Sequence, residues 1–93
     1  MPEPTFEWND AKNRANQKKH GVSFEMAQRA FLDPRALIAE DTRHSEAEPR
    51  FYCFGDVDGA ILTVRFTWRD EIIRIFGAGY WHKGKDAYEE ANG

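Results

Sequence analysis

Cysteine is almost absent from this 93-residue chain, and the single Cys53 leaves no partner for an internal disulfide. No group of cysteine and histidine residues has the spacing of a zinc site, so we predict no bound metal. Apolar runs of about 18 residues, which a membrane-spanning helix needs, are missing too. The acidic start of the chain does not resemble a signal peptide. Together these absences predict a soluble protein of the reducing cytoplasm.

Three common catalytic signatures are also missing. The chain has no Walker-type phosphate loop, no Gly-x-Ser-x-Gly nucleophile turn and no dinucleotide-binding fingerprint. These absences remove support for the P-loop, serine-hydrolase and dinucleotide-dependent classes, and we expect no cofactor.

The chain does contain enough apolar and aromatic residues for one modest core. Hydrophobic residues make up 41% of the sequence, which argues against wholesale disorder. A chain of this length buries roughly 60–65% of the surface that its unfolded form exposes. We therefore expect one domain over residues 1–93.

The charge of the chain is negative overall but unevenly distributed. The formal net charge of −3 argues against a generic nucleic-acid binder. Residues 10–20 nevertheless carry four Lys or Arg against one Asp, and residues 59–85 carry five against two acidic residues. The two basic segments make one functional face if they meet in space, and otherwise they are ordinary solvated surfaces.

The first third of the chain predicts a strand and two helices. Residues 6–8 alternate as a strand does and lead into a polar helix over residues 10–20. Only Ala11 and Ala15 in this helix have the spacing of a packing stripe. A second helix over residues 24–32 is expected to end at the proline that follows it. Ser23 is the expected N-cap of this second helix, and Asn9-Asp10 and Gly21 are the expected N-cap pair and C-cap of the first.

A short strand over residues 36–39 and an acidic loop over residues 40–49 come next. In the loop, His44 lies near Asp41 and Glu46, which would suit a metal site or an acid–base pair. A solvated loop is the commoner outcome for such a segment, so these three residues are not among our main candidates.

The clearest feature is a predicted hairpin. Residues 61–68 and 71–76 are rich in β-branched and aromatic residues, and the turn between them is placed at residues 69–70. In that register Arg65 lies directly opposite Arg74. Like charges in this position are destabilising unless something compensates them, such as a bound phosphate or a neighbouring carboxylate.

A third strand over residues 50–54 pairs with this hairpin through the Asp58-Gly59 turn signal, which places Tyr52 opposite Arg65. Because side chains alternate along a strand, the sheet has an apolar face and an opposite face. The apolar face, which we expect to take the helices, holds Phe51, Cys53, Leu62, Val64, Phe66, Ile73 and Ile75. The opposite face holds Arg50, Tyr52, Phe54, Thr63, Arg65, Thr67, Ile72, Arg74 and Phe76.

Arginines interleaved with aromatic residues suit phosphates and unstacked bases. Alternatively, another chain or the C-terminal segment covers the aromatic residues. That segment begins with residues 77–85, whose three glycines predict an irregular path, and ends with a short helix over residues 86–91. Its potential chemistry gathers in Tyr80, Trp81, His82, Lys83 and Lys85.

Such residue types suffice for metal-independent RNA cleavage, in which the 2′-hydroxyl attacks the adjacent phosphodiester. The reaction needs a base, cations for the anionic phosphate and an acid for the leaving oxygen. Arg65 and Arg74 suit the cation role, and His82 or Tyr80 suits proton transfer. Lys19 and His20 either extend this surface or simply complement the dipole at the end of the first helix. The candidates for RNA contact are Lys19, His20, Arg50, Tyr52, Lys83 and Lys85.

Two groups of residues in the chain also recur together in a known pattern. The first group is Phe6, Trp8, Lys12, Asn16, Lys19, His20, Gly21, Phe24, Phe31, Asp33 and Pro34. The second group is His44, Ser45, Glu48, Arg50, Gly55, Arg74, Ala78, Tyr88 and Glu89. The pattern spans nearly the whole chain and resembles the BrnT family, the toxin halves of type II toxin–antitoxin modules.

This resemblance implies a fold similar to RelE ribonucleases. We expect two N-terminal helices on one face of a mainly antiparallel four- to five-stranded sheet, with a short C-terminal helix. The resemblance further implies a toxin that cleaves RNA and slows translation. Its partner would be an antitoxin with a ribbon-helix-helix DNA-binding part, bound in a hetero-oligomer.

The chain departs from the family pattern after the last strand. BrnT-like chains have a Ser-Ala-Arg run there, whereas this chain has Gly77-Ala78-Gly79 and lacks the arginine expected near position 79. Two hypotheses follow. Either the basic residues of the C-terminal segment replace that arginine, or the chain is a protein-binding module of the same fold that has lost ribonuclease activity.

Overall fold

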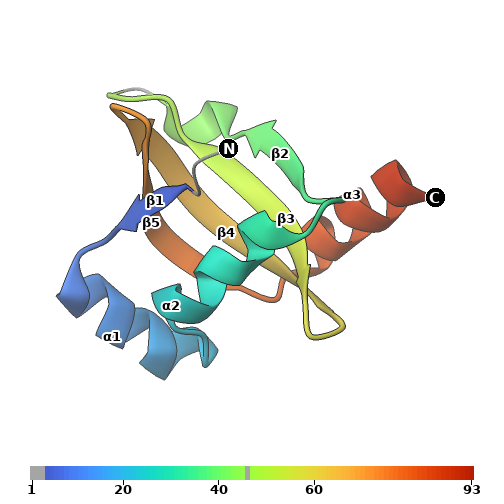
Figure 1. Cartoon of the computed structure of the whole chain (residues 1–93), viewed down its shortest axis with the longest axis horizontal. Coiled ribbons are helices and arrows are strands. Elements are labelled where there is room, and N and C mark those ends of the chain that lie inside the picture. The colour runs from blue at the N-terminus through green and yellow to red at the C-terminus, as the bar shows by residue number, and fades with distance from the viewer. Residues whose placement is uncertain (1–3, 46) are drawn as a thin grey trace.

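Five strands form one sheet in the computed structural model, which describes residues 4–45 and 47–93 (Figure 1). The elements in chain order are β1 (Thr5–Glu7), α1 (Asp10–His20), α2 (Phe24–Ala27), the 3-10 helix η1 (Gln28–Leu32), β2 (Leu37–Glu40), the 3-10 helix η2 (Thr42–His44), β3 (Phe51–Val57), β4 (Ala60–Arg69), β5 (Ile72–Gly79) and α3 (His82–Asn92). The α+β class predicted from the sequence is confirmed.

The strand order across the sheet is β1-β5-β4-β3-β2. β1 runs parallel to β5, whereas the other neighbouring strands are antiparallel, so the sheet is mixed. Figure 1 shows α2 and η1 crossing one face of the sheet and α3 on the other. None of the helices in the described residues is long and apolar enough to cross a membrane.

The predicted helix signals act as capping groups. Asn9 Oδ1 accepts a hydrogen bond from the Lys12 amide at 3.0 Å, and Ser23 Oγ accepts one from the Met26 amide at 3.0 Å. Gly21 ends α1 in the left-handed conformation, with φ of 70°. The second predicted helix differs from expectation, because α2 tightens into η1 after its first turn.

α1 attaches to the rest of the protein through amides rather than through an alanine stripe. Ala11 and Ala15 are exposed, so the predicted packing stripe is wrong, and the buried residues of the helix are Asn13 and Asn16. Asn16 Nδ2 donates to the carbonyls of Val22 and Ala78 at 2.8 and 2.9 Å, and its Oδ1 accepts from the Ala78 amide at 3.2 Å. A polar helix thus docks by satisfying backbone groups that would otherwise be buried without partners.

The register between β3 and β4 is the one predicted. Val57 pairs with Ala60, and Tyr52 pairs with Arg65. Asp58 and Gly59 occupy the turn with φ of 54° and 91°, as a two-residue hairpin loop with positive φ at both positions requires.

The register between β4 and β5 corrects the prediction. The turn is formed by Asp70 and Glu71, with φ of 50° and 72°, so Arg74 faces Thr67 instead of Arg65. This slip of two residues keeps each side chain of the hairpin on its predicted face, which is why the apolar pattern alone cannot detect it. An irregularity at Phe76 then shifts the pairing again and places Arg65 opposite Gly77.

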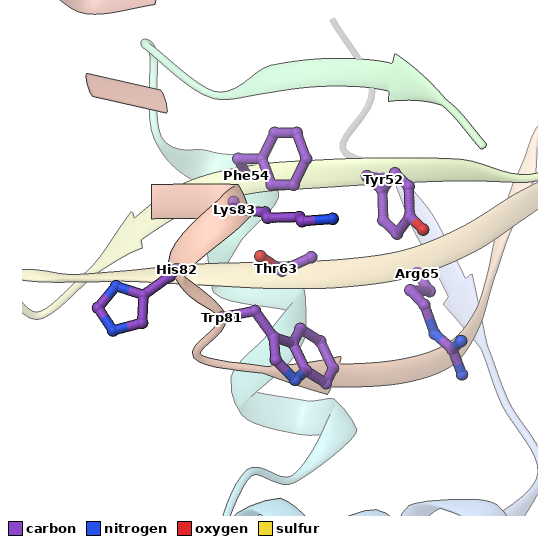
Figure 2. A pocket seen from close by; sticks show the side chains of 8 residues that line it. Tyr52, Phe54, Thr63, Arg65, Trp81, His82 and Lys83 are labelled. Atoms are coloured by element: carbon purple, nitrogen blue, oxygen red, sulfur yellow. The ribbon is translucent and has the colours of Figure 1, made fainter. Parts of the chain in front are cut away.

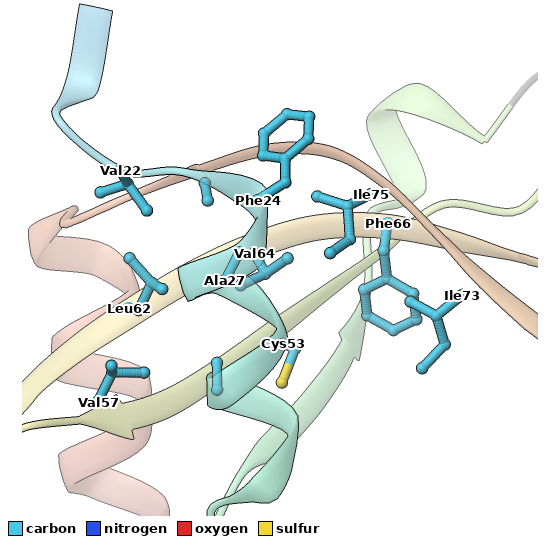
Figure 3. Packing of buried hydrophobic residues seen from close by; sticks show 12 residues of the cluster. Val22, Phe24, Ala27, Cys53, Val57, Leu62, Val64, Phe66, Ile73 and Ile75 are labelled. Atoms are coloured by element: carbon cyan, nitrogen blue, oxygen red, sulfur yellow. The ribbon is translucent and has the colours of Figure 1, made fainter. Parts of the chain in front are cut away.

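The hydrophobic core lies between this sheet and the α2–η1 segment. Figure 3 shows Phe24 and Ala27 of α2 over side chains from β3, β4 and β5. Gly55 permits the closest approach, because a Cβ there would meet the backbone of Ala30 in η1. The fully buried or nearly buried core residues are Val22, Phe24, Ala27, Ala30, Cys53, Val57, Leu62, Val64, Phe66, Ile73, Ile75 and Ala78.

α3 covers one end of the opposite, outer face of the sheet. Gly84 packs so closely on β3 and β4 that a Cβ there would meet Thr63 Oγ1 and approach the Phe54 ring to 2.9 Å. The C-terminal segment therefore covers Phe54, which was one of the two interpretations left open for the aromatic residues. The segment is also more regular than predicted, since Gly77, Ala78 and Gly79 continue β5.

Candidate nucleic-acid interface

Arg65 lies at the junction of two depressions on the outer face. The larger one, which we call the aromatic pocket, has a volume of about 460 Å³ and lies between the sheet and the start of α3 (Figure 2). Its lining residues are Tyr52, Phe54, Thr63, Arg65, Trp81, His82, Lys83 and Gly84. The smaller one, which we call the His44 cleft, has a volume of only about 10 Å³ and is lined by Asp41, His44, Arg50, Phe51, Arg65 and Phe76.

A buried carboxylate holds the imidazole of the His44 cleft. Asp41 is 6% exposed, and its Oδ2 lies 2.8 Å from His44 Nδ1. Burial alone would raise the pKa of Asp41, but the hydrogen bond and charge of His44, together with hydrogen bonding to Tyr52, bring that pKa below its usual value. The ionised carboxylate therefore accepts a hydrogen bond from Nδ1, and Nε2 is the ring nitrogen that Asp41 does not contact.

The loop around this pair is also pinned by its own hydrogen bonds. Ser45 Oγ donates to the Asp41 carbonyl at 2.6 Å and accepts from the Arg50 amide at 3.0 Å. The Asp41 amide donates to the Arg50 carbonyl at 2.7 Å. Glu46, the third member of the predicted cluster, lies outside the described residues.

Tyr52 connects the His44 cleft with the aromatic pocket. Its pKa is raised, first by burial and then by the charge of Asp41 and hydrogen bonding to it, whereas the charge of Arg65 acts in the opposite direction. The Tyr52 ring stacks on Phe54 with centroids 5.7 Å apart and planes at 17°. Tyr52 thus carries its polar contact toward the cleft, while its ring packs on Phe54 in the wall of the pocket.

The guanidinium of Arg65 depends on a neighbouring glycine for its space. A Cβ at Gly77 would lie 3.1 Å from Arg65 Nη2, so a larger residue there would crowd the side chain. Arg50, the second cation of the cleft, lies over the Phe76 ring with its guanidinium carbon 4.5 Å from the ring centroid. Two predicted basic residues therefore meet at the cleft.

Arg74 is engaged elsewhere. Its Nη1 donates to Glu7 Oε2 at 2.6 Å, and its side chain is 24% exposed. The charge of Arg74 is therefore compensated by a neighbouring carboxylate, which was one of the two possibilities raised by the sequence. Glu7 of β1 supplies this carboxylate. The predicted cross-strand pair of Arg65 and Arg74 does not exist.

The candidates of the C-terminal segment separate into two groups. Lys83 extends into the aromatic pocket, whereas the imidazole of His82 points away from Arg65 (Figure 2). Tyr80 and Lys85 line a different depression, which His82 also borders. The proton-transfer residues predicted from the sequence thus lie on the far side of the pocket from the His44 cleft.

The end of α1 reaches the same surface through one side chain. His20 packs edge-to-face against Trp81 with centroids 5.1 Å apart, and Lys19 is exposed beside it in the chain. Trp81 in turn lies over Gly79, where a Cβ would come within 2.9 Å of the indole. The position near which the resemblance led us to expect an arginine is therefore covered by an aromatic ring.

Sequence reasoning did not place His44 among the main candidates, whereas the structure places it in one cleft with Arg65. The signal available was the Asp-x-x-His spacing in a segment that turns, since one turn of 3-10 helix brings residues three apart together. Its proximity to Arg65 depends on the β2–β3 connection and could not be read from spacing. No group of three or more His, Cys, Asp or Glu side chains within residues 4–45 and 47–93 has an arrangement that could hold a metal ion.

These features define a small α+β protein whose outer face combines cations with exposed aromatic rings. Residues 8–84 match the family model described as the ribonuclease toxin BrnT of type II toxin–antitoxin systems, and the chain belongs to this family. No curated protein matches the chain. The family identified from the sequence pattern is confirmed, and the RelE-like fold stays a prediction.

Proposed function

We propose that this protein is the toxin of a type II toxin–antitoxin module and a metal-independent endoribonuclease that acts in the cytoplasm and inhibits translation. Family membership supports the ribonuclease class. The observation that carries the proposed chemistry is the shared cleft of Arg65 and His44, where a buried carboxylate orients the imidazole. A cation and an oriented proton acceptor are two of the three groups that this reaction needs.

In the proposed reaction, the RNA 2′-oxygen attacks its own phosphorus and the bond from phosphorus to the 5′-oxygen breaks. His44 Nε2 takes the proton of the 2′-hydroxyl, and the negative charge of Asp41 stabilises the imidazolium that forms. Arg65 and Arg50 stabilise the charge that develops on the phosphate oxygens. The products are a 2′,3′-cyclic phosphate and a free 5′-hydroxyl.

The leaving 5′-oxygen needs a proton, and His82 and Tyr80 remain the candidates for donating it from the other side of the aromatic pocket. Lys83, Lys85, Lys19 and His20 would contact the backbone of the RNA beyond the cleft. Arg74 has a weaker claim to the cleavage chemistry than Arg65 has, because Glu7 already neutralises it.

The test uses the purified chain, RNA and EDTA, with three single variants of the proposed site and one control variant. We expect Arg65→Ala and His44→Ala to abolish cleavage and growth arrest in a bacterial host, and Arg74→Ala to retain most of both. Arg29→Ala is the matched control, since Arg29 pairs with Asp58 away from the cleft. Full activity of folded Arg65→Ala, or cleavage of an RNA with a 2′-deoxy sugar at the scissile position, would refute the proposed chemistry.

A type II module implies a protein antitoxin as partner. We propose that this antitoxin carries a ribbon-helix-helix DNA-binding part and forms a hetero-oligomer with the toxin. Co-expression with the product of an adjacent gene should restore growth and yield a complex that binds operator DNA. A complex that restores growth but lacks DNA binding would exclude this type of antitoxin.

One observation favours a second function. Gly79 and the Trp81 ring stand where the family pattern has an arginine, which suits a protein-binding module without ribonuclease activity. Normal growth and intact RNA upon expression of the folded chain would support that alternative.

A further inference from the structure

The aromatic pocket has a feature that the cleavage chemistry does not use: two aromatic walls beside two cations. We propose that it binds one unstacked base of the RNA next to the scissile phosphate, which makes it a base-binding subsite. The inference rests on the proposed ribonuclease function for the identity of its ligand.

The walls of the pocket suit a flat ring. Figure 2 shows Tyr52 and Phe54 on one side of Thr63 and Trp81 on the other, with Lys83 extending between Phe54 and Thr63 toward Tyr52. Trp81 is 38% exposed, so part of the indole is free for a ligand. Stacking on such rings stabilises a bound base without selecting its identity, because every base has a π-face.

Trp81 is held in place before any ligand arrives. The close approach to Gly79 fixes the indole against β5, and the edge-to-face contact with His20 supports it from α1. A ring positioned in this way loses little conformational entropy when a base stacks on it. The glycine that departs from the family pattern thus makes room for an aromatic wall.

The charge of the pocket matches a nucleotide. Arg65 and Lys83 are its cations, and none of the described residues that line it is acidic. This composition contrasts with the net charge of −3 of the whole chain. An apolar slot with cationic ends favours a base attached to phosphates over an uncharged apolar ligand.

The position of the pocket connects it with the His44 cleft. Arg65 lines both depressions, so a phosphate bound by its guanidinium lies between them. A neighbouring nucleotide can then turn its base into the aromatic pocket while the 2′-hydroxyl faces His44. Unstacking a single strand in this way is the usual mode of sequence-tolerant RNA binding.

The test measures binding of a short 2′-O-methyl RNA, whose blocked 2′-oxygen cannot attack the phosphate. Trp81→Ala should weaken binding by about 5-fold to 140-fold, the effect of losing one base–aromatic stack. Trp81→Phe should retain most of the affinity. Trp68→Ala is the matched control, because Trp68 is 47% exposed on β4 and lies outside the pocket. Lys83→Ala should make the slope of log affinity against log salt concentration shallower by about 1, the effect of losing one phosphate contact.

A second arm replaces single bases of the same oligonucleotide with abasic positions. At one position, an abasic site should lower the affinity of the wild-type protein as much as Trp81→Ala lowers its affinity for the intact RNA. The same abasic site should not lower the affinity of the Trp81→Ala variant any further. If that coupling is found while RNA cleavage is absent, the base subsite stands and the ribonuclease function fails. If cleavage occurs but no abasic position couples to Trp81, or Lys83→Ala leaves the salt dependence unchanged, the subsite is overturned.

Discussion

Replacing Asn16, a buried residue of α1, with alanine should destabilise the protein more than replacing any exposed residue of this helix with alanine. The substitution leaves the carbonyls of Val22 and Ala78 and the amide of Ala78 without their buried partner. At about 1–2 kcal/mol for each of the three unsatisfied groups, less about 0.5 kcal/mol of improved helix propensity, the expected loss is about 2.5–5.5 kcal/mol. A domain of this size has a stability of roughly 5–14 kcal/mol, so the loss is a large fraction of the whole.

Urea unfolding followed by tryptophan fluorescence measures this loss, and the melting temperature should fall by at least about 10 °C. Arg14→Ala is the control on the same helix, because Arg14 is exposed. Hydrogen exchange at the Ala78 amide should accelerate in Asn16→Ala, which would place the effect at this site. A loss below about 1 kcal/mol would refute the argument that amide contacts hold α1 on the sheet.

Three further predictions concern the core and its supports. The pKa of Asp33 is lowered, first by the hydrogen bond that the Tyr88 hydroxyl donates at 2.6 Å. The ionised carboxylate of Asp33 therefore stabilises the folded protein at pH values above its usual pKa of 3.8, and this stabilisation is lost as the pH falls through the pKa of the folded state. Tyr88→Phe should therefore lower the urea midpoint at pH 7 and flatten the loss of stability below pH 4, and equal midpoints at pH 7 would contradict this. Gly55→Ala should abolish folding or lower the melting temperature strongly, because the new methyl group meets the Ala30 backbone, and a wild-type circular dichroism melt would count against it. Burial raises the pKa of Cys53 to about 12, so a thiol reagent at neutral pH should label it only in urea, and rapid labelling of the native protein would contradict its burial.

Sequence reasoning succeeded for the hairpin of β3 and β4 and failed for that of β4 and β5, for a physical reason. Asp58-Gly59 is a turn that accepts positive φ at little cost, so only one register satisfies it. The second turn offers Asp70 and Glu71 without a glycine, and positions shifted by two residues present the same apolar face. The apolar pattern therefore determined the face of each strand, and the register remained ambiguous.

For the candidate site, too, local sequence patterns predicted some of the neighbouring residues and missed others. Placing Arg65 and Tyr52 together on the outer face required only the alternation of strands and one reliable turn. The partner of Arg74 is Glu7, which lies 67 residues earlier and belongs to a strand joined in parallel. No local pattern connects two such residues, and the same is true of His44 and Arg65.

The sequence by itself determined the α+β class, the helix caps, the two faces of the antiparallel strands and the family. These properties depend on residues close together along the chain or on a period of two. Only the tertiary structure decided which cations are free and which are paired, that α1 is held by Asn16 instead of alanines, and that Trp81 covers Gly79. Each of these depends on contacts between distant segments, whose geometry is set by the packing of the whole sheet.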